Sequence, residues 1–135
     1  MINSYTITSQ PIAVDDTLNF NVSRILTGCT VKHVDGSASF TLTKPGYYYV
    51  TFNADVLGTA AGDVTAELIN GTVAVPGATA TTTIAIGETA NIAFATIIRV
   101  LPSCAAIDNT TTLTILNTGV AVTYTNANIN ITKLC

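Results

Sequence analysis

The sequence predicts an all-β protein, folded as a single β-sandwich or jelly roll of antiparallel strands. Three observations lead to this fold class. First, β-branched residues dominate, with threonine alone at 25 positions, and such residues pack well on a pleated sheet. Second, apolar and polar residues alternate in short runs that glycine and proline separate. Third, no window of a dozen residues has helical apolar spacing without a glycine, a proline or a threonine cluster inside it.

Eleven candidate strands follow from this alternation, in chain order. They are expected at roughly 4–9, 17–22, 24–33, 39–43, 47–57, 64–69, 79–86, 90–101, 111–116, 120–125 and 128–134. Turn-forming residues stand between many of them, at Asp35-Gly36, Lys44-Pro45-Gly46, Ala61-Gly62-Asp63, Asn70-Gly71, Pro76-Gly77, Ile86-Gly87-Glu88, Leu101-Pro102-Ser103 and Thr118-Gly119. Strands this short, at this spacing in 135 residues, indicate one sandwich with no linker, repeat or second domain.

The chain carries little charge for a free-standing domain. It has 5 Lys and Arg against 8 Asp and Glu, a charged fraction of 10% beside 48% hydrophobic residues. This composition excludes a disordered tail, a basic nucleic-acid-binding domain and a charged coiled coil. A folded monomer of 14.0 kDa exposes roughly 6,700 Å², or about one charge per 500 Å², which is sparse for a soluble surface. The deficit predicts a surface of Thr, Asn and Ser, or burial against other subunits.

Two expected strands carry the most information about assembly. In 90–101 both faces are largely apolar. One face therefore packs the core, and the other, lined by small residues, meets another subunit or a covering strand. In 47–57, Tyr47 and Tyr49 lie opposite the core stripe, where they suit either an interface or an exterior shielded by threonines. The predicted trimer-interface residues are Tyr47, Tyr49, Ala93, Ala95, Ile97 and Leu101.

The first residues and the cysteines bear on the cellular context. Residues 1–5 have neither the positive nor the apolar region of a secretory signal, and no run reaches the ~18 apolar residues of a membrane helix. We expect synthesis in a cytoplasm, release by lysis or by assembly into a particle, and no membrane insertion. Cys29, Cys104 and Cys135 fit neither a disulfide framework nor a zinc site. They are expected to be free thiols, with a cross-link between neighbours through Cys135 as the alternative.

The sequence contains no catalytic constellation. The only histidine is His33, beside Lys32 and Asp35, and we expect it at a strand end or in an interface rather than in general acid-base catalysis. The only close carboxylate pair, Asp15-Asp16, falls in a turn. Neither a phosphate-binding glycine loop nor a metal-spaced set of His and Cys is present. We therefore expect no catalytic, cofactor-binding or metal site, and no enzyme.

One stretch of the chain carries a known signature. Phe40, five further residues and then Gly46-x-Tyr48-x-Val50-x-Phe52 resemble the pattern F-x5-G-x-Y-x-F-x-F of the complement and tumour-necrosis-factor-like jelly-roll superfamily. Val50 stands in place of the middle aromatic residue. The stretch looks particularly like the versions in phage structural proteins and in the head domains of collagen-tailed bacterial spore-surface proteins.

The resemblance covers roughly 24–134. Those bacterial and phage members place a hairpin like that at Asn70-Gly71, and the superfamily's further upstream aromatic position falls here on His33. The resemblance implies a jelly roll of about ten antiparallel strands that assembles as a tight homotrimer, with the signature residues in its core. Residues 24–135 would form this domain. Residues 1–23 would be either an N-terminal arm that attaches to a shell or the first strands of the same subunit.

These features predict a non-enzymatic structural protein of a phage virion, either a trimeric capsid decoration or a head-fibre or tail module. Its expected partners are its own copies and a capsid or other virion protein, with no nucleic acid. The alternative is an adhesion module of a bacterial cell or spore surface, although the sequence lacks the collagen-like stalk usual in such proteins. A third possibility is a trimer that binds a host receptor or glycan through loops 58–63 and 103–110.

Overall fold

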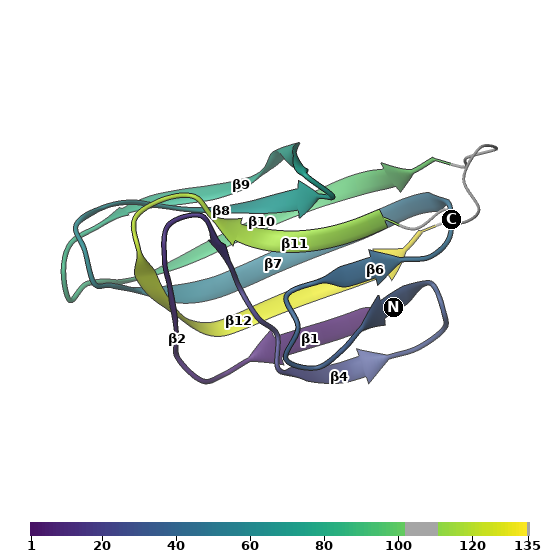
Figure 1. Ribbon diagram of the computed structural model, residues 1–135, viewed down its shortest axis with the longest axis horizontal. Coiled ribbons are helices and arrows are strands. Elements are labelled where there is room, and N and C mark those ends of the chain that lie inside the picture. Colours follow the sequence, from purple (N-terminus) through teal and green to yellow (C-terminus); the bar gives the residue numbers. More distant parts are fainter. Residues whose placement is uncertain (102–110, 135) are drawn as a thin grey trace.

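The computed structural model describes residues 1–101 and 111–134, which form two antiparallel β-sheets packed face to face (Figure 1). No helix among these residues is long and apolar enough to cross a membrane. Sheet A has the order β10 (Thr89–Val100), β7 (Gly46–Gly58), β12 (Val122–Lys133), β1 (Ile2–Thr6) and β4 (Val22–Leu26), and β2 (Gln10–Ile12) pairs with β12. Sheet B has the order β5 (Val31–His33), β6 (Phe40–Leu42), β11 (Thr111–Asn117), β8 (Gly62–Asn70) and β9 (Val73–Ile84), and β3 (Asp16–Thr17) pairs with β11. Each sheet thus has five strands in continuous order and one short additional strand, which confirms the predicted all-β sandwich of about ten antiparallel strands.

The long strand β7 determines the two faces of sheet A. It pairs with β10 on one side and with β12 on the other, along nearly its whole length. Alternate side chains of a strand point to opposite faces, so every second side chain of β7 enters the core. These core side chains, none more than 1% exposed, are Tyr48, Val50, Phe52, Ala54 and Val56. The opposite stripe, which begins with Tyr47 and Tyr49, faces away from sheet B.

Aromatic contacts join the two sheets. Phe40 of sheet B and Phe52 of sheet A both pack edge-on against Phe20, with ring centroids 5.3 Å and 6.4 Å away. Phe52 also contacts Phe94 of β10 at 5.3 Å. Each such pair stabilises the fold by about 0.5–1.5 kcal/mol beyond the burial of its area. Phe20, in the connection between β3 and β4, therefore lies at the centre of the core.

His33 takes the place of a core aromatic residue. It is the last residue of β5, and its ring stacks on Phe40 with centroids 4.1 Å apart and planes 10° apart. Its Nδ1 lies 2.9 Å from the carbonyl oxygen of Ser39, and its Nε2 lies 3.0 Å from that of Phe20. The ring thus packs as an aromatic side chain and also contacts the β3–β4 and β5–β6 connections. His33 lies at a strand end, one of the two positions expected from the sequence.

The first half of the chain departs from the expected strands. Residues 18–21 form no strand; Leu18 and Phe20 are instead fully buried side chains of a connection. The expected strand 24–33 is two strands, β4 and β5, because the chain turns at Gly28, where φ is +77°. Alternating apolar residues indicate which side chains enter the core. They do not by themselves separate a strand from a loop that anchors the same side chains.

The second half differs in two places. The expected strands 120–125 and 128–134 are one strand, β12, which contains a bulge where Asn126 has φ of +51°. Pro76 and Gly77, predicted as a turn, lie inside β9. Because β9 is the edge strand of sheet B and Pro76 lies between Ala74 and Thr79, where β9 has no partner residue in β8, the proline removes no ladder hydrogen bond. The turn predicted at Asn70-Gly71 does connect β8 to β9.

Residues 1–23 are built into the sandwich. β1 lies between β12 and β4 in sheet A, and Ile2, Ile12, Leu18 and Phe20 belong to the same hydrophobic core as the rest of the chain. Within this chain the segment therefore packs as part of the sandwich. One core spans the expected boundary at residue 23.

A buried polar cluster closes one end of the sandwich. The hydroxyl of Tyr124 donates to Asn117 Oδ1 at 3.0 Å, and Asn117 Nδ2 donates to the carbonyl oxygens of Ala13 and Val120 at 3.2 and 3.1 Å. Tyr124 and Asn117 are both fully buried, as polar groups in a core are when they are hydrogen-bonded. The cluster ties β11 and β12 to the connection between β2 and β3.

Tyr124→Phe tests this cluster. The substitution leaves Asn117 Oδ1 without its donor, so we expect a loss of about 1–3 kcal/mol in the free energy of unfolding at neutral pH. Burial also raises the pKa of Tyr124 above its ordinary value of 10.0. The unfolded chain therefore releases this proton first, and stability falls as the pH rises above about 10.

The measurement is urea unfolding followed by circular dichroism at several pH values between about 7 and 11. The Phe variant should be less stable than the wild type at neutral pH and should lose less stability above about pH 10. Tyr49→Phe, at an exposed side chain, is the matched control and should change the neutral value by less than about 0.5 kcal/mol. Equal neutral stability of the Tyr124 variant and the wild type would contradict the role given to the cluster.

Candidate subunit interface

The outer face of sheet A brings together most of the residues predicted for a subunit interface. The register places Ile97 opposite Tyr49 and Ala95 opposite Thr51, with all four side chains on the face directed away from sheet B. Leu101 follows the end of β10 and is 61% exposed. The predicted residues that share the outer face within β7 and β10 are Tyr47, Tyr49, Ala93, Ala95 and Ile97.

One end of this face is apolar. We call Tyr47, Tyr49, Ala95 and Ile97 the apolar zone. In the single chain, Ile97 is 57% exposed and the two tyrosines just over 40% each, although large apolar side chains are normally covered. The guanidinium group of Arg99 lies 5.6 Å from the centroid of the Tyr47 ring, so the zone ends in a cation–π contact.

Beside the apolar zone runs a row of amide side chains that satisfy one another. Asn3 Nδ2 donates to Asn128 Oδ1 at 2.7 Å and to Asn130 Oδ1 at 2.6 Å. Asn130 Nδ2 in turn donates to Thr51 Oγ1 at 3.1 Å. Because these bonds lie within one chain, a second subunit can cover the row without leaving these groups unpaired.

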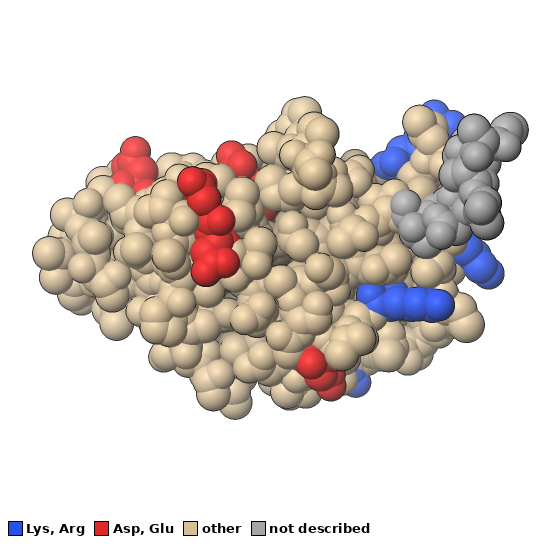
Figure 2. Space-filling model, in the orientation of Figure 1, with Lys and Arg blue, Asp and Glu red and all other residues tan. Residues whose placement is uncertain are grey.

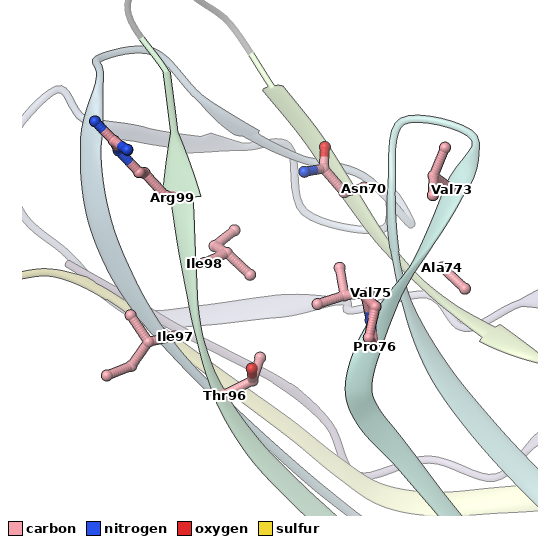
Figure 3. Close-up of a pocket in the computed structure, with 9 residues that line it drawn as sticks. All are labelled: Asn70, Val73, Ala74, Val75, Pro76, Thr96, Ile97, Ile98 and Arg99. Carbon is pink, nitrogen blue, oxygen red and sulfur yellow. The ribbon is translucent and has the colours of Figure 1, made fainter.

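A groove opens where the two sheets part. β9 is the edge of sheet B and β10 the edge of sheet A, on the same side of the sandwich (Figure 1). Figure 3 shows Thr96 and Ile98 pointing from β10 toward β9, and Ile97 and Arg99 pointing the other way. We call this the edge groove; its volume is about 520 Å³, and it is lined by Asn70, Val73, Ala74, Val75, Pro76, Thr96, Ile97, Ile98 and Arg99.

The edge groove and the apolar zone are continuous around β10, because Ile97 belongs to both. Sequence reasoning missed the groove, since Pro76-Gly77 reads as a turn and therefore appears to end a strand. The alternation of Val73 and Val75 just before it was the available signal. Val73, 67% exposed, is one of the apolar side chains at this edge without cover.

The charges are distributed unevenly along the sandwich. Figure 2 shows a largely uncharged surface, with most acidic side chains toward one end and basic side chains toward the end where the termini lie. The pairing agrees: Arg99 and Lys133 lie beside the start of β7, whereas Asp55 and Asp63 lie near its other end. The basic side chains thus gather toward one end of the sandwich and most acidic ones toward the other.

The structure also places the other residues considered from the sequence, namely possible metal ligands, the cysteines and the loops 58–63 and 103–110. Among residues 1–101 and 111–134, no three or more His, Cys, Asp or Glu side chains are grouped as metal ligands would be. Cys29 is an exposed free thiol. Cys104, Cys135 and the loop 103–110 lie outside the described residues. Residues 58–63 comprise the end of β7, the connection 59–61 and the start of β8.

Two antiparallel sheets of six strands each, five of them in one continuous order, form a jelly roll, and the fold is similar to that of the complement C1q globular domain and of tumour-necrosis-factor-like proteins. The globular domain of zebrafish complement 1qA is similar over 99% of this chain and 96% of its own, with a TM-score of 0.71 and 13% identity. The Eiger TNF of S. frugiperda is similar over 99% of this chain and 91% of its own, with a TM-score of 0.74 and 12% identity. The vertex protein P5 of phage PRD1 is similar over 99% of this chain and 96% of its own, with a TM-score of 0.60 and 14% identity. No protein-family model and no curated protein sequence matches the chain.

Ile97→Asp tests whether the apolar zone is covered by a second subunit. In an isolated chain the new carboxylate is exposed and should change stability by less than about 0.5 kcal/mol. In an assembly it is buried without a partner, so the complex should dissociate. Ala95→Asp should act in the same way.

Size-exclusion chromatography with light scattering measures the outcome. The wild type should have about three times the chain mass of 14.0 kDa, and the Asp variants should elute at the single-chain mass with native circular dichroism. Thr112→Asp, at an exposed position of β11 in sheet B, is the matched control and should keep the wild-type mass. A stable Ile97→Asp trimer would show that this face is not the interface.

Proposed function

We propose that the chain is a structural protein of a phage virion, a homotrimer that decorates the capsid or forms a head-fibre or tail module. It acts by assembly and adhesion and catalyses no reaction. The observation that carries the proposal is the continuity of the apolar zone with the edge groove around β10. Together they make an uncovered surface that is rare on a free-standing monomer.

The shape of this surface supports a ring of three rather than a twofold pair. A twofold contact joins a patch to the same patch on its partner, whereas a ring joins two different patches. Here the two patches differ: a broad sheet face on one side of β10 and an open sandwich edge on the other. The edge of each copy can therefore lie on the face of the next, and three such contacts close the ring. The sequence resemblance implies the same number of copies.

The virion role rests on two likenesses and on composition. The signature from Phe40 to Phe52 resembles phage versions of the superfamily, and the fold is similar to that of the vertex protein P5 of phage PRD1. A surface rich in Thr and Asn with a charged fraction of 10% suits a protein that is covered on several sides. Residues 1–23 belong to the sandwich, and their exposed side chains Ile7 and Val14, 67% and 53% exposed, are the proposed points of attachment.

Purified particles test the virion assignment. In a lysate of the host, antibodies to the chain should label phage particles in electron micrographs, and the chain should sediment with particles through a density gradient. Its gene should lie beside capsid and portal genes. Labelling of the bacterial or spore surface, with none on particles, would overturn the virion role in favour of a surface adhesion module.

A further inference from the structure

Most of the charged side chains lie toward one end of the sandwich or the other (Figure 2). The carboxylates gather where β7 finishes, and the lysines gather where β7 begins. All five Lys and Arg of the chain are among the described residues, and none lies with these carboxylates. We call Asp15, Asp16, Asp63 and Glu88 the acidic end, and Lys32, Lys44 and Lys133 the basic end.

Backbone hydrogen bonds fix the positions of the carboxylates at the acidic end. The N–H of Asp15 donates to the carbonyl oxygen of Asn117 at 2.7 Å, and the N–H of Val120 donates to that of Asp63 at 2.9 Å. The carbonyl oxygen of Glu88 accepts from the last residue of β7 at 2.9 Å. These bonds join the connections β2–β3, β9–β10 and β11–β12 to the two sheets. The acidic side chains are exposed on a fixed frame.

The basic end is built around the start of β7. Lys44 lies in the connection that leads into β7, and its carbonyl oxygen accepts from the hydroxyl of Tyr48 at 2.6 Å. Lys133 of β12 is the pairing partner of Tyr48. Lys32 of β5 pairs with Thr41, three residues before Lys44. The three lysines therefore come from both sheets and lie toward the same end of the sandwich.

The two ends are far enough apart to act independently. β7 spans 13 residues, which is about 40 Å at about 3.3 Å per residue. Salt screens exposed charges beyond the Debye length, which is about 10 Å at 0.1 M. Two copies that meet end to end therefore respond to the ends that face each other rather than to the net charge of −3. Like ends repel and unlike ends attract, so only head-to-tail order is favourable.

We propose that copies of this protein stack end to end, with the acidic end of one against the basic end of the next. A polycation would satisfy the acidic end alone and a polyanion the basic end alone, whereas a second copy satisfies both through one repeated contact. Ile86 near the acidic end and Leu134 near the basic end are exposed apolar side chains. The contact would therefore also remove apolar surface from water.

The stack uses neither the apolar zone nor the edge groove, so it is compatible with a ring of three. It rests on the proposed ring and deepens its fibre form. In a ring whose threefold axis runs along the strands, rotation keeps the three acidic ends on one side and the three basic ends on the other. Exposed ion pairs are individually weak, but three sets then act together. Because a head-to-tail contact of this kind does not close, the rings form a line.

Sedimentation velocity of the native full chain at several protein concentrations tests the proposal. In about 0.1 M salt the mean mass should grow with concentration in steps of one ring, and electron micrographs should show lines with a repeat of about 40 Å. In about 1 M salt, where the Debye length is about 3 Å, the ring alone should remain.

The outcomes separate the stack from the ring. Rings that stay single in 0.1 M salt, or growth that 1 M salt leaves unchanged, would overturn the stack and leave the proposed ring standing. The single-chain mass in 1 M salt would instead overturn the ring.

Two charge-reversed variants identify the ends. The basic-end variant carries Lys32→Glu, Lys44→Glu and Lys133→Glu. The acidic-end variant carries Asp16→Lys, Asp63→Lys and Glu88→Lys. Each should keep native circular dichroism and the ring mass in 1 M salt, and neither should grow alone in 0.1 M salt, although their net charges change in opposite directions.

An equimolar mixture of the two variants is the decisive control. One variant then has two acidic ends and the other two basic ends, so the mixture should grow again in 0.1 M salt, with the two variants alternating. Growth of either variant alone to the extent of the wild type, or a mixture that stays as separate rings, would overturn the proposed contact.

Discussion

The pairing register of β7 is the constraint on which both faces of sheet A depend. β7 pairs residue by residue with β10 and β12, and side chains alternate with a period of two. A slip of one residue would therefore move Tyr48, Val50 and Phe52 to solvent and bring the outer stripe into the core. Phe52 makes the slip costly, because it meets Phe20 and Phe94 at fixed ring distances. The same packing that holds the core thus aims Tyr49 and Asp55 outward.

On that outer face, hydrogen bonds within the chain replace charge. The amides of Asn3, Asn128 and Asn130 satisfy one another, and Asp55 is held by Asn91 and Asn126. A face built in this way loses little when another surface covers it, because few unpaired polar groups must be stripped of water. Low charge is therefore compatible with solubility at one stage and with burial at another.

The sequence was most informative where strands are long and regular. Period-two alternation in 47–57 and 90–101 placed the core stripe and the outer stripe correctly, since no loop interrupts either strand. It failed at 17–22 and 24–33, because Leu18 and Phe20 enter the core from a connection and Gly28 turns the chain between β4 and β5. It also failed at Pro76-Gly77, because whether a proline ends a strand depends on which strand forms the edge of the sheet, a property of the whole fold.

Two parts of the outer face of sheet A differ in how far the sequence predicts them. The apolar zone lies on two neighbouring strands, each with a visible pattern, so its residues could be named from the sequence. By contrast, the contacts of Asn126 with Asp55 and of Arg24 with Tyr5 join strands distant in sequence, and both depend on bulges at Arg24 and Asn126. A bulge adds one residue to a strand and leaves no composition signal when that residue is an ordinary Arg or Asn. Contacts of this kind follow from the pairing of strands distant in sequence, and only the three-dimensional register places their residues together.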